Sequence, residues 1–132
     1  RRQRQMCIRD RAETVLERNM FRESVRRRRC IIPAGQYYEW DAQKNKVTFS
    51  GQDQPVLYLA GFFDRFQDGD HFVILTTEAN AFVSPVHDRM PLILEKEELE
   101  SWIYDDAFLE FALHKVPAKL QKSQEYEQQT LF

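Results

Sequence analysis

Two segments of the chain carry side chains that could move protons, and the first of them surrounds Glu39. Glu39 stands between Tyr38 and Trp40. Alternate side chains of a strand point to opposite faces, so Glu39 would face away from both rings. If that face lines a cleft, apolar surroundings would raise the pKa of the carboxyl and suit it to general acid–base catalysis. If the face is solvated, Glu39 is an ordinary surface residue.

The second segment is the loop 84–91, which reads Ser-Pro-Val-His-Asp-Arg-Met-Pro. Its two prolines stiffen the backbone, and His87 is followed directly by an acid and a base. A rigid loop that presents a histidine in this way is a common support for a catalytic group, although a loop histidine without any role is the alternative. His71 and His114 fall at a strand start and on a helix, and we interpret both as structural.

Anion binding is the remaining chemistry that the residue types offer. Thr14 and Glu17 fit a capping box, so Arg11 precedes a predicted helix start, where a guanidinium and backbone N–H groups can share a phosphate. Three histidines and two cysteines lack the spacing of metal ligands, and only four glycines are present, with no glycine-rich phosphate loop. We therefore expect neither a metal ion nor a cofactor.

Hydrophobic patterning predicts the scaffold that must hold these side chains. Apolar runs bounded by turn residues predict short strands, the Asp-Gly pair within 67–70 predicts a hairpin, and helical spacing predicts short helices. The strands are expected at 30–32, 36–40, 47–49, 56–63, 71–76 and 92–94, and the helices within 14–28, 97–104 and 107–115. This order predicts an α+β fold with a bent, barrel-like sheet that is mixed but largely antiparallel, flanked by short helices.

The 132 residues suit one domain, and their net charge of −2 conceals an asymmetry. Residues 1–30 hold eleven arginines and four acids, whereas residues 31–132 hold eight basic and seventeen acidic side chains. A basic amino-terminal third favours contact with a polyanion, but arginines at a helix end also complement the helix dipole without any ligand. The chain has no apolar run long enough to cross a membrane, and two cysteines are consistent with a reducing, cytoplasmic compartment.

Five stretches in order resemble the SOS response-associated peptidase (SRAP) family, the abasic-site-processing proteins. They are the segments 11–14, 28–40, 59–65, 74–80 and 84–91. The likeness covers most of residues 11–116, which we interpret as a partial SRAP-like domain. It is flanked by a segment 1–10 that is expected to be unmatched and disordered, and by a polar tail at 117–132.

The resemblance implies binding of single-stranded DNA at an abasic site and a covalent link to its aldehyde, as part of the DNA damage (SOS) response. The family's nucleophile is an amino-terminal cysteine whose amine and thiol close a thiazolidine ring. By motif match, Glu39 and His87 take the family's acid–base roles at the sugar. Arg11 takes a phosphate-binding role, and we add Arg18, Arg89, Tyr37 and Trp40 as DNA-binding candidates.

The departures from the family pattern lead to expectations about the amino terminus. The family begins Met-Cys-Gly and carries a further portion before the Arg11 segment, and it usually has Asn where this chain has Arg9. We expect a truncated or misread sequence that lacks amino-terminal strands and, because its first residue is Arg1, forms no thiazolidine crosslink. Cys30 lies inside a strand motif and is interpreted as a core residue.

Three functions stay open at this point. The first is an abasic-site processing protein with peptidase-like or lyase-like chemistry. The second is a non-catalytic module that binds single-stranded DNA through arginines and stacking aromatics. The third is a peptidase limited to processing its own amino terminus. In each case we expect a monomer that does not bind membranes.

Overall fold

The computed structural model describes residues 7–125, apart from the side chains of Cys7, Phe66 and Glu125. Its strands are β1 (Cys7–Arg11), β2 (Arg29–Ala34), β3 (Tyr37–Trp40), β4 (Lys46–Ser50), β5 (Leu57–Phe66), β6 (Gly69–Glu78), β7 (Arg89–Pro91), β8 (Ile93–Leu94) and β9 (Gln121–Glu125). Its helices are α1 (Arg22–Arg27), α2 (Leu99–Tyr104) and α3 (Asp106–Leu113), with 3-10 turns η1 (Val15–Glu17) and η2 (Lys96–Glu98).

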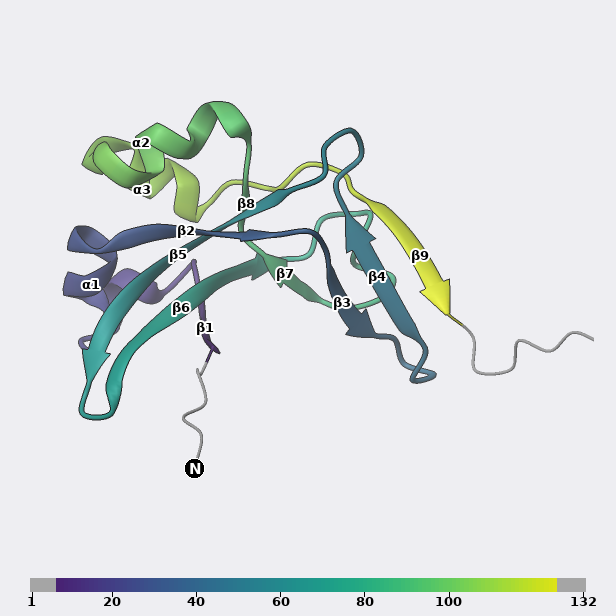
Figure 1. The fold of residues 1–132 in the computed structure, drawn as a ribbon, viewed down its shortest axis with the longest axis horizontal. Coiled ribbons are helices and arrows are strands. Elements are labelled where there is room, and N and C mark those ends of the chain that lie inside the picture. Colours follow the sequence, from purple (N-terminus) through teal and green to yellow (C-terminus); the bar gives the residue numbers. More distant parts are fainter. Residues whose placement is uncertain (1–6, 126–132) are drawn as a thin grey trace, which may run out of the picture.

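The larger sheet is built around the long hairpin of β5 and β6 (Figure 1). Its main strand order is β1-β6-β5-β2, with β7 paired to β6 and β8 paired to β5. Gly69 opens β6 with a φ of 127°, a conformation that glycine adopts without a side-chain clash, so the Asp-Gly signal correctly predicted this turn. Within the described residues, β1 and β6 form the single parallel pair and all other pairings are antiparallel. The predicted α+β fold with a bent, largely antiparallel sheet and short helices is confirmed.

A smaller sheet of three strands, in the order β3-β4-β9, lies at the other end of the molecule (Figure 1). The strand β3 enters this sheet directly after β2 leaves the larger one, so the turn 35–36 joins the two sheets. This connection brings the face of β3 that carries Glu39 toward the larger sheet. The bend between the sheets therefore creates the space in which the site forms.

The alternation of β5 divides the hydrophobic core into two clusters. Tyr58, Ala60 and Phe62 point to the face that α1, α2 and α3 cover, where Trp102 is fully buried. Leu57 and Leu59 point to the opposite face and pack with residues of the smaller sheet. Because both faces of β5 are apolar and covered, this strand reads as a continuous hydrophobic run.

Two expectations about the ends of the chain are wrong over the described residues. The segment 1–10 was expected to be disordered, but residues 7–10 belong to β1, because their backbone groups pair with β6 and Ile8 packs against the core. Residues 1–6 lie outside the described residues. The segment 117–132 was expected to be a polar tail outside the domain, but Leu120 is buried and β9 pairs with β4 over five residues, while residues 126–132 are outside the described range.

The predicted capping box at Thr14 and Glu17 also does not form, because Thr14 makes no side-chain cap hydrogen bond. Instead the chain makes only a 3-10 turn there, and helix α1 follows after residue 21. The two carboxyl-terminal helices form where they were expected. Among the described helices, none has the length and apolarity to span a membrane.

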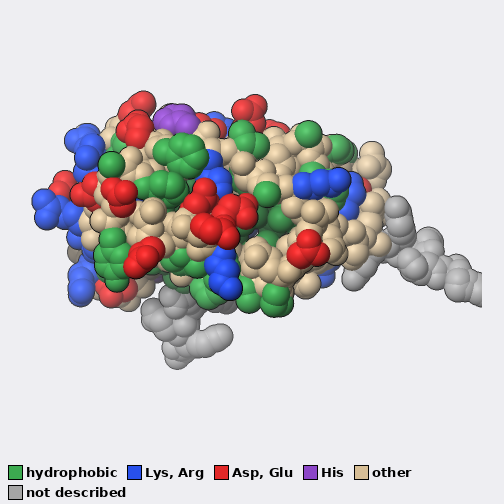
Figure 2. Space-filling view, turned by 90° about the horizontal axis from the view of Figure 1, so that it is seen from above, with side chains coloured by type: hydrophobic (Ala, Val, Ile, Leu, Met, Phe, Trp, Pro, Cys, Tyr) green, Lys and Arg blue, Asp and Glu red, His purple; other side chains and the backbone are tan. Residues whose placement is uncertain are grey.

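The arginine run that follows α1 is held largely by the protein itself. The Arg29 side chain is only 2% exposed and donates to the carbonyls of Trp102 and Val25 and to Asp106. Viewed from the side of α2 and α3, several basic side chains gather at the end of the molecule that carries α1, and basic, acidic and apolar groups are mixed over the rest of this face (Figure 2). The Arg29 charge is therefore compensated by groups of the protein and needs no ligand.

Candidate active site

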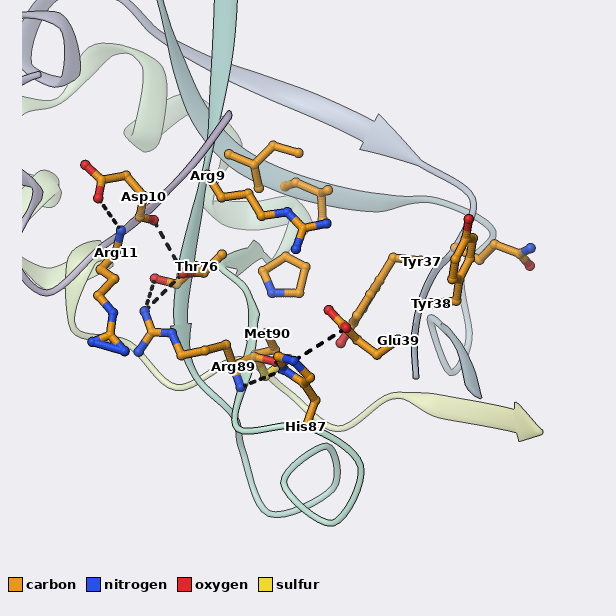
Figure 3. Close-up of a pocket in the computed structure, with 14 residues that line it drawn as sticks. Arg9, Asp10, Arg11, Tyr37, Tyr38, Glu39, Thr76, His87, Arg89 and Met90 are labelled. Atoms are coloured by element: carbon orange, nitrogen blue, oxygen red, sulfur yellow. Dashed lines mark hydrogen bonds and ion pairs between the residues drawn. The ribbon is translucent and has the colours of Figure 1, made fainter. Parts of the chain in front are cut away.

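A cleft of about 650 Å³ opens between the two sheets, on the face of the larger sheet that lacks helices (Figure 3). Strands β1, β3 and β7 and the end of the loop before β7 contribute its polar walls, and Leu59 and Ile74 form an apolar part of the lining. The full lining is Arg9, Asp10, Arg11, Gln36, Tyr37, Tyr38, Glu39, Leu59, Ile74, Thr76, His87, Arg89, Met90 and Pro91. The cleft thus gathers residues from all five stretches singled out in the sequence.

The two predicted acid–base residues meet in this cleft. His87 Nε2 lies 3.6 Å from Glu39 Oε1, and the two side chains are 37% and 18% exposed. Tyr38 and Trp40 are 52% and 55% exposed on the outer face of β3, so Glu39 does point away from both rings as the alternation predicted. A carboxylate and an imidazole at this distance can divide a proton transfer between them once a ligand lies in the cleft.

The backbone of β7 orients the imidazole. His87 Nδ1 lies 3.2 Å from the Arg89 N–H and 3.3 Å from the Arg89 carbonyl oxygen. The amide can only donate and the carbonyl can only accept, so Nδ1 has a backbone partner with or without a proton, while Nε2 faces Glu39. The neighbouring Asp88 carboxylate is 3.7 Å from Nδ1 and 92% exposed.

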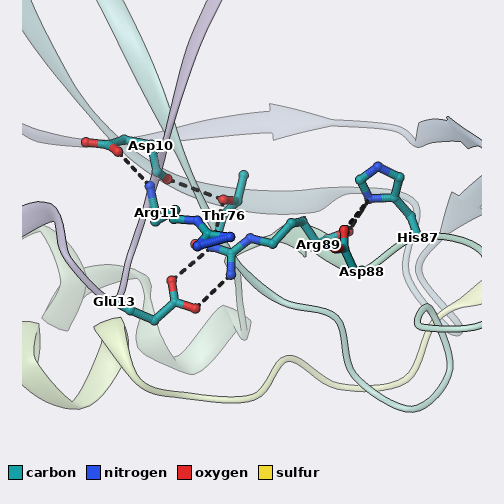
Figure 4. A network of polar contacts seen from close by, with 7 residues as sticks. All are labelled: Asp10, Arg11, Glu13, Thr76, His87, Asp88 and Arg89. Atoms are coloured by element: carbon teal, nitrogen blue, oxygen red, sulfur yellow. Dashed lines mark hydrogen bonds and ion pairs between the residues drawn. The ribbon is translucent and has the colours of Figure 1, made fainter.

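The Arg89 side chain is bound from two sides (Figure 4). It donates to both carboxylate oxygens of Glu13 at 2.8 and 2.9 Å, and to the carbonyl and hydroxyl oxygens of Thr76 at 3.0 Å each. The hydrogen bond from Arg89 lowers the pKa of Glu13 from 4.5 to about 2, and Glu13 in turn raises the pKa of Arg89. This network ties the segment after β1 to β6 and β7, beside the backbone that holds His87.

Tyr37 forms part of the cleft wall on the same face of β3 as Glu39. Its ring stacks on Phe49 with centroids 5.1 Å apart, so one face of the ring is already covered. Burial, together with the nearby Glu39 charge, raises the pKa of the Tyr37 hydroxyl well above its usual value of 10. Tyr37 is therefore a neutral hydroxyl donor beside the carboxylate throughout the physiological pH range.

The remaining predicted DNA-binding residues divide into two groups. Arg11 and Arg89 line the cleft, and the Arg11 guanidinium forms no ion pair with any residue of 7–125. Arg18 lies outside the cleft lining, with its Nε 3.4 Å from Asp10 Oδ2, and Trp40 lies on the outer face of β3. A contact of any of these residues with DNA stays a prediction.

Among the lining and supporting residues that were not proposed from the sequence are Glu13, Thr76 and Arg9. Glu13 stands in the same motif as Arg11, but its partner is 76 residues away in the chain. Thr76 was visible only as a strand residue, and Arg9 was assigned to a segment expected to lie outside the fold. Of these three residues, Glu13 and Thr76 lie inside stretches that the sequence analysis had singled out, whereas Arg9 lies outside them.

Cys30 was expected in the core but is only partly buried. It lies within β2, and burial raises the pKa of its thiol from 9.0 to about 11, so the thiolate is scarce near neutral pH. The other two histidines are held by local partners: His71 lies 2.8 Å from Asp68, and His114 contacts the Glu110 carbonyl. Across residues 7–125, no three His, Cys, Asp or Glu side chains gather as a metal-binding group would require.

The fold and the cleft residues agree with one protein family. The sequence pattern of the SOS response associated peptidase (SRAP) family matches residues 1–129, and the chain belongs to that family. The match extends beyond the stretch 11–116 at both ends.

The relatives include curated proteins and solved structures. The chain is 32% identical over 105 residues to the abasic site processing protein YoaM of Bacillus subtilis, covering 73% of this chain and 46% of the relative. It is 29% identical over 103 residues to the abasic site processing protein YedK of Escherichia coli, covering 73% and 46%. A crystal structure of a protein from Bordetella bronchiseptica is 26% identical, with a TM-score of 0.79, and covers 89% of this chain and 64% of that one. The chain thus spans about half the length of these curated relatives.

Proposed function

We propose that this protein processes abasic sites in single-stranded DNA, with the abasic sugar bound in the cleft between the sheets. The observation that carries the proposal is the 3.6 Å approach of His87 to Glu39 inside a cleft lined by arginines, in a chain of the SRAP family. Relatives that are 29% to 32% identical to this chain are named as abasic site processing proteins. Arg11 supplies positive charge at the cleft wall for a backbone phosphate.

The chemistry that suits this pair is the opening of the sugar ring. A closed abasic sugar is a hemiacetal, and opening it moves one proton off the C1 hydroxyl and another onto the ring oxygen as the bond between C1 and that oxygen breaks. Glu39 accepts the first proton, and His87 in its doubly protonated, cationic form supplies the second from Nε2, which leaves an open-chain aldehyde and a neutral imidazole. Cys30 is not the residue that would capture this aldehyde, because it is an internal residue of β2 with a raised thiol pKa of about 11.

Binding is tested first with two labelled single strands of one sequence, one intact and one with a single abasic sugar. Fluorescence anisotropy titrations should give at least tenfold tighter binding to the abasic strand. Equal affinities for the two strands would contradict the proposal. Raising the salt concentration should weaken both complexes, because phosphate contacts release counterions.

Single substitutions then separate binding from chemistry. Glu39→Gln and His87→Gln should retain binding but slow formation of the aldehyde, trapped with a hydroxylamine probe, by roughly 10²–10⁴-fold. Arg11→Gln should weaken binding of both strands and reduce the slope of the salt dependence by about 1. Arg65→Gln is the matched control, because Arg65 is 79% exposed at the far hairpin and lies outside the cleft. An unchanged rate in both Glu39→Gln and His87→Gln would refute the acid–base assignment.

A further inference from the structure

The Tyr37 hydroxyl is a buried polar group without a partner. Its oxygen is shielded from water and makes no hydrogen bond with any residue that the structure describes. A buried hydroxyl that lacks a partner costs about 1–3 kcal/mol, so such groups are rare and call for an explanation. In this case Tyr37 lines the cleft, so a ligand can supply the missing acceptor once the wall around the hydroxyl shifts enough to admit it.

The surroundings of Tyr37 fix the hydroxyl in place. Its ring is stacked on Phe49, which is fully buried, and Tyr37 pairs with Phe49 across β3 and β4. The ring therefore has little freedom to turn its hydroxyl outward to solvent. The ring position is thus fixed, so a ligand that reaches the hydroxyl avoids the entropy cost of ordering the tyrosine side chain.

Glu39 lies two residues along the same strand face, so the cleft presents a donor and an acceptor side by side. Figure 3 shows both side chains extending from β3 to the same side, where His87 approaches the carboxylate. The negative charge of Glu39 acts on the hydroxyl and disfavours its ionisation. Tyr37 thus donates and Glu39 accepts, with His87 on the far side of the carboxylate.

A donor beside an acceptor matches a hydroxyl group, which can accept one hydrogen bond and donate another. We infer that Tyr37 and Glu39 together recognise the C1 hydroxyl of the abasic sugar, with Tyr37 donating to its oxygen and Glu39 accepting its proton. This inference rests on the proposed function and adds a specificity-determining residue to it. An intact nucleotide carries a base at C1 and offers no hydroxyl to this pair.

The test compares two ligands that differ in that hydroxyl alone. Single strands with an abasic sugar, or with its tetrahydrofuran analogue that lacks the C1 hydroxyl, are titrated against wild type and Tyr37→Phe by anisotropy. Intact-mass measurement verifies that the signal comes from the reversible complex. Wild type should prefer the hydroxyl-bearing strand roughly five- to tenfold, and Tyr37→Phe should bind both strands equally.

Tyr104→Phe is the control tyrosine, because Tyr104 lies on α2, is 79% exposed and lies outside the cleft lining. It should keep the preference for the hydroxyl. Thermal unfolding gives a second readout that does not depend on DNA. Because the hydroxyl has no protein partner, Tyr37→Phe should leave the unfolding midpoint unchanged or raise it, whereas a hydroxyl with a structural role would lower it.

The outcomes separate this inference from the proposed function. If wild type binds both modified strands equally, yet more tightly than an intact strand, the hydroxyl recognition is wrong and abasic-site binding stands. A preference that survives in Tyr37→Phe, or a lowered unfolding midpoint of that variant, would also overturn the role of Tyr37. If no abasic strand binds better than the intact strand, the proposed function fails and this inference fails with it.

Discussion

Arg89 and Glu13 lie 76 residues apart in the chain and form a bidentate ion pair, with N–O distances of 2.8 and 2.9 Å. The pair holds the segment after β1 beside the start of β7. Because the backbone N–H of the same Arg89 contacts the His87 ring, the ion pair also fixes the segment that orients the imidazole. A residue that looks from its sequence like a free phosphate ligand thus has a structural partner as well.

This pair makes stability depend on pH in the acid range. The pKa of Glu13 is lowered from 4.5 to about 2 in the folded protein, so its contribution is complete above about pH 4.5 and is lost as the pH falls toward 2. Glu13 is 37% exposed, so the contribution at neutral pH is only about 1 kcal/mol. Glu13→Gln should lower the unfolding free energy by this amount at pH 7 and by much less near pH 2.

Urea denaturation of wild type and Glu13→Gln at both pH values measures this difference. Glu17→Gln is the control, because Glu17 is exposed and forms no ion pair within 7–125. Its unfolding free energy should follow that of wild type at each pH. If wild type and Glu13→Gln differ as much in unfolding free energy near pH 2 as at pH 7, the carboxylate charge is not the cause of the difference.

Gly61 offers a prediction about the sheet that supports the cleft. A Cβ at this position would lie 2.4 Å from the Val73 carbonyl oxygen and 2.6 Å from Ile32 Cδ1. The carbonyl belongs to β6, which pairs with β5, so it cannot retreat without disturbing that pairing. Gly61→Ala should therefore lower the unfolding free energy by about 2–3 kcal/mol.

Gly35→Ala is the matched comparison in the same measurement. No atom lies within 4 Å of a Cβ built at Gly35, so this variant should differ from wild type by less than about 0.5 kcal/mol. Chemical denaturation of both variants gives the two values under one set of conditions. Equal losses in both would mean that chain flexibility, and not the close approach of β6, determines the cost.

Local patterns predicted the elements well because their information lies within a few residues. The apolar run at 56–63 and the Asp-Gly turn predicted the hairpin of β5 and β6, and the period of two predicted that Glu39 opposes Tyr38 and Trp40. The meeting of Glu39 with His87 came from the family resemblance, since no spacing in the sequence brings them together.

What the sequence did not reveal depends on contacts between distant segments. The pairing of β1 with β6 joins residues more than sixty positions apart, and β1 has too few apolar residues to be predicted as a strand. Distant contacts also determine that Arg89 pairs with Glu13, and that the Tyr37 hydroxyl has no partner among residues 7–125. Charge composition alone also could not distinguish the buried Arg29 from an arginine that is exposed to a ligand.

The position of the His87 proton is the property of the cleft on which the proposed proton transfer depends most directly. The Glu39 carboxylate faces Nε2 at 3.6 Å, whereas Nδ1 faces both the backbone N–H of Arg89 at 3.2 Å and its carbonyl oxygen at 3.3 Å. Because Nδ1 has a backbone partner with or without a proton, the carboxylate is the contact that favours a proton on Nε2. Nitrogen-15 NMR of wild type should therefore show a protonated Nε2, and Glu39→Gln should weaken this preference because it removes the carboxylate. An unprotonated Nε2 in wild type would remove His87 as the donor to the ring oxygen.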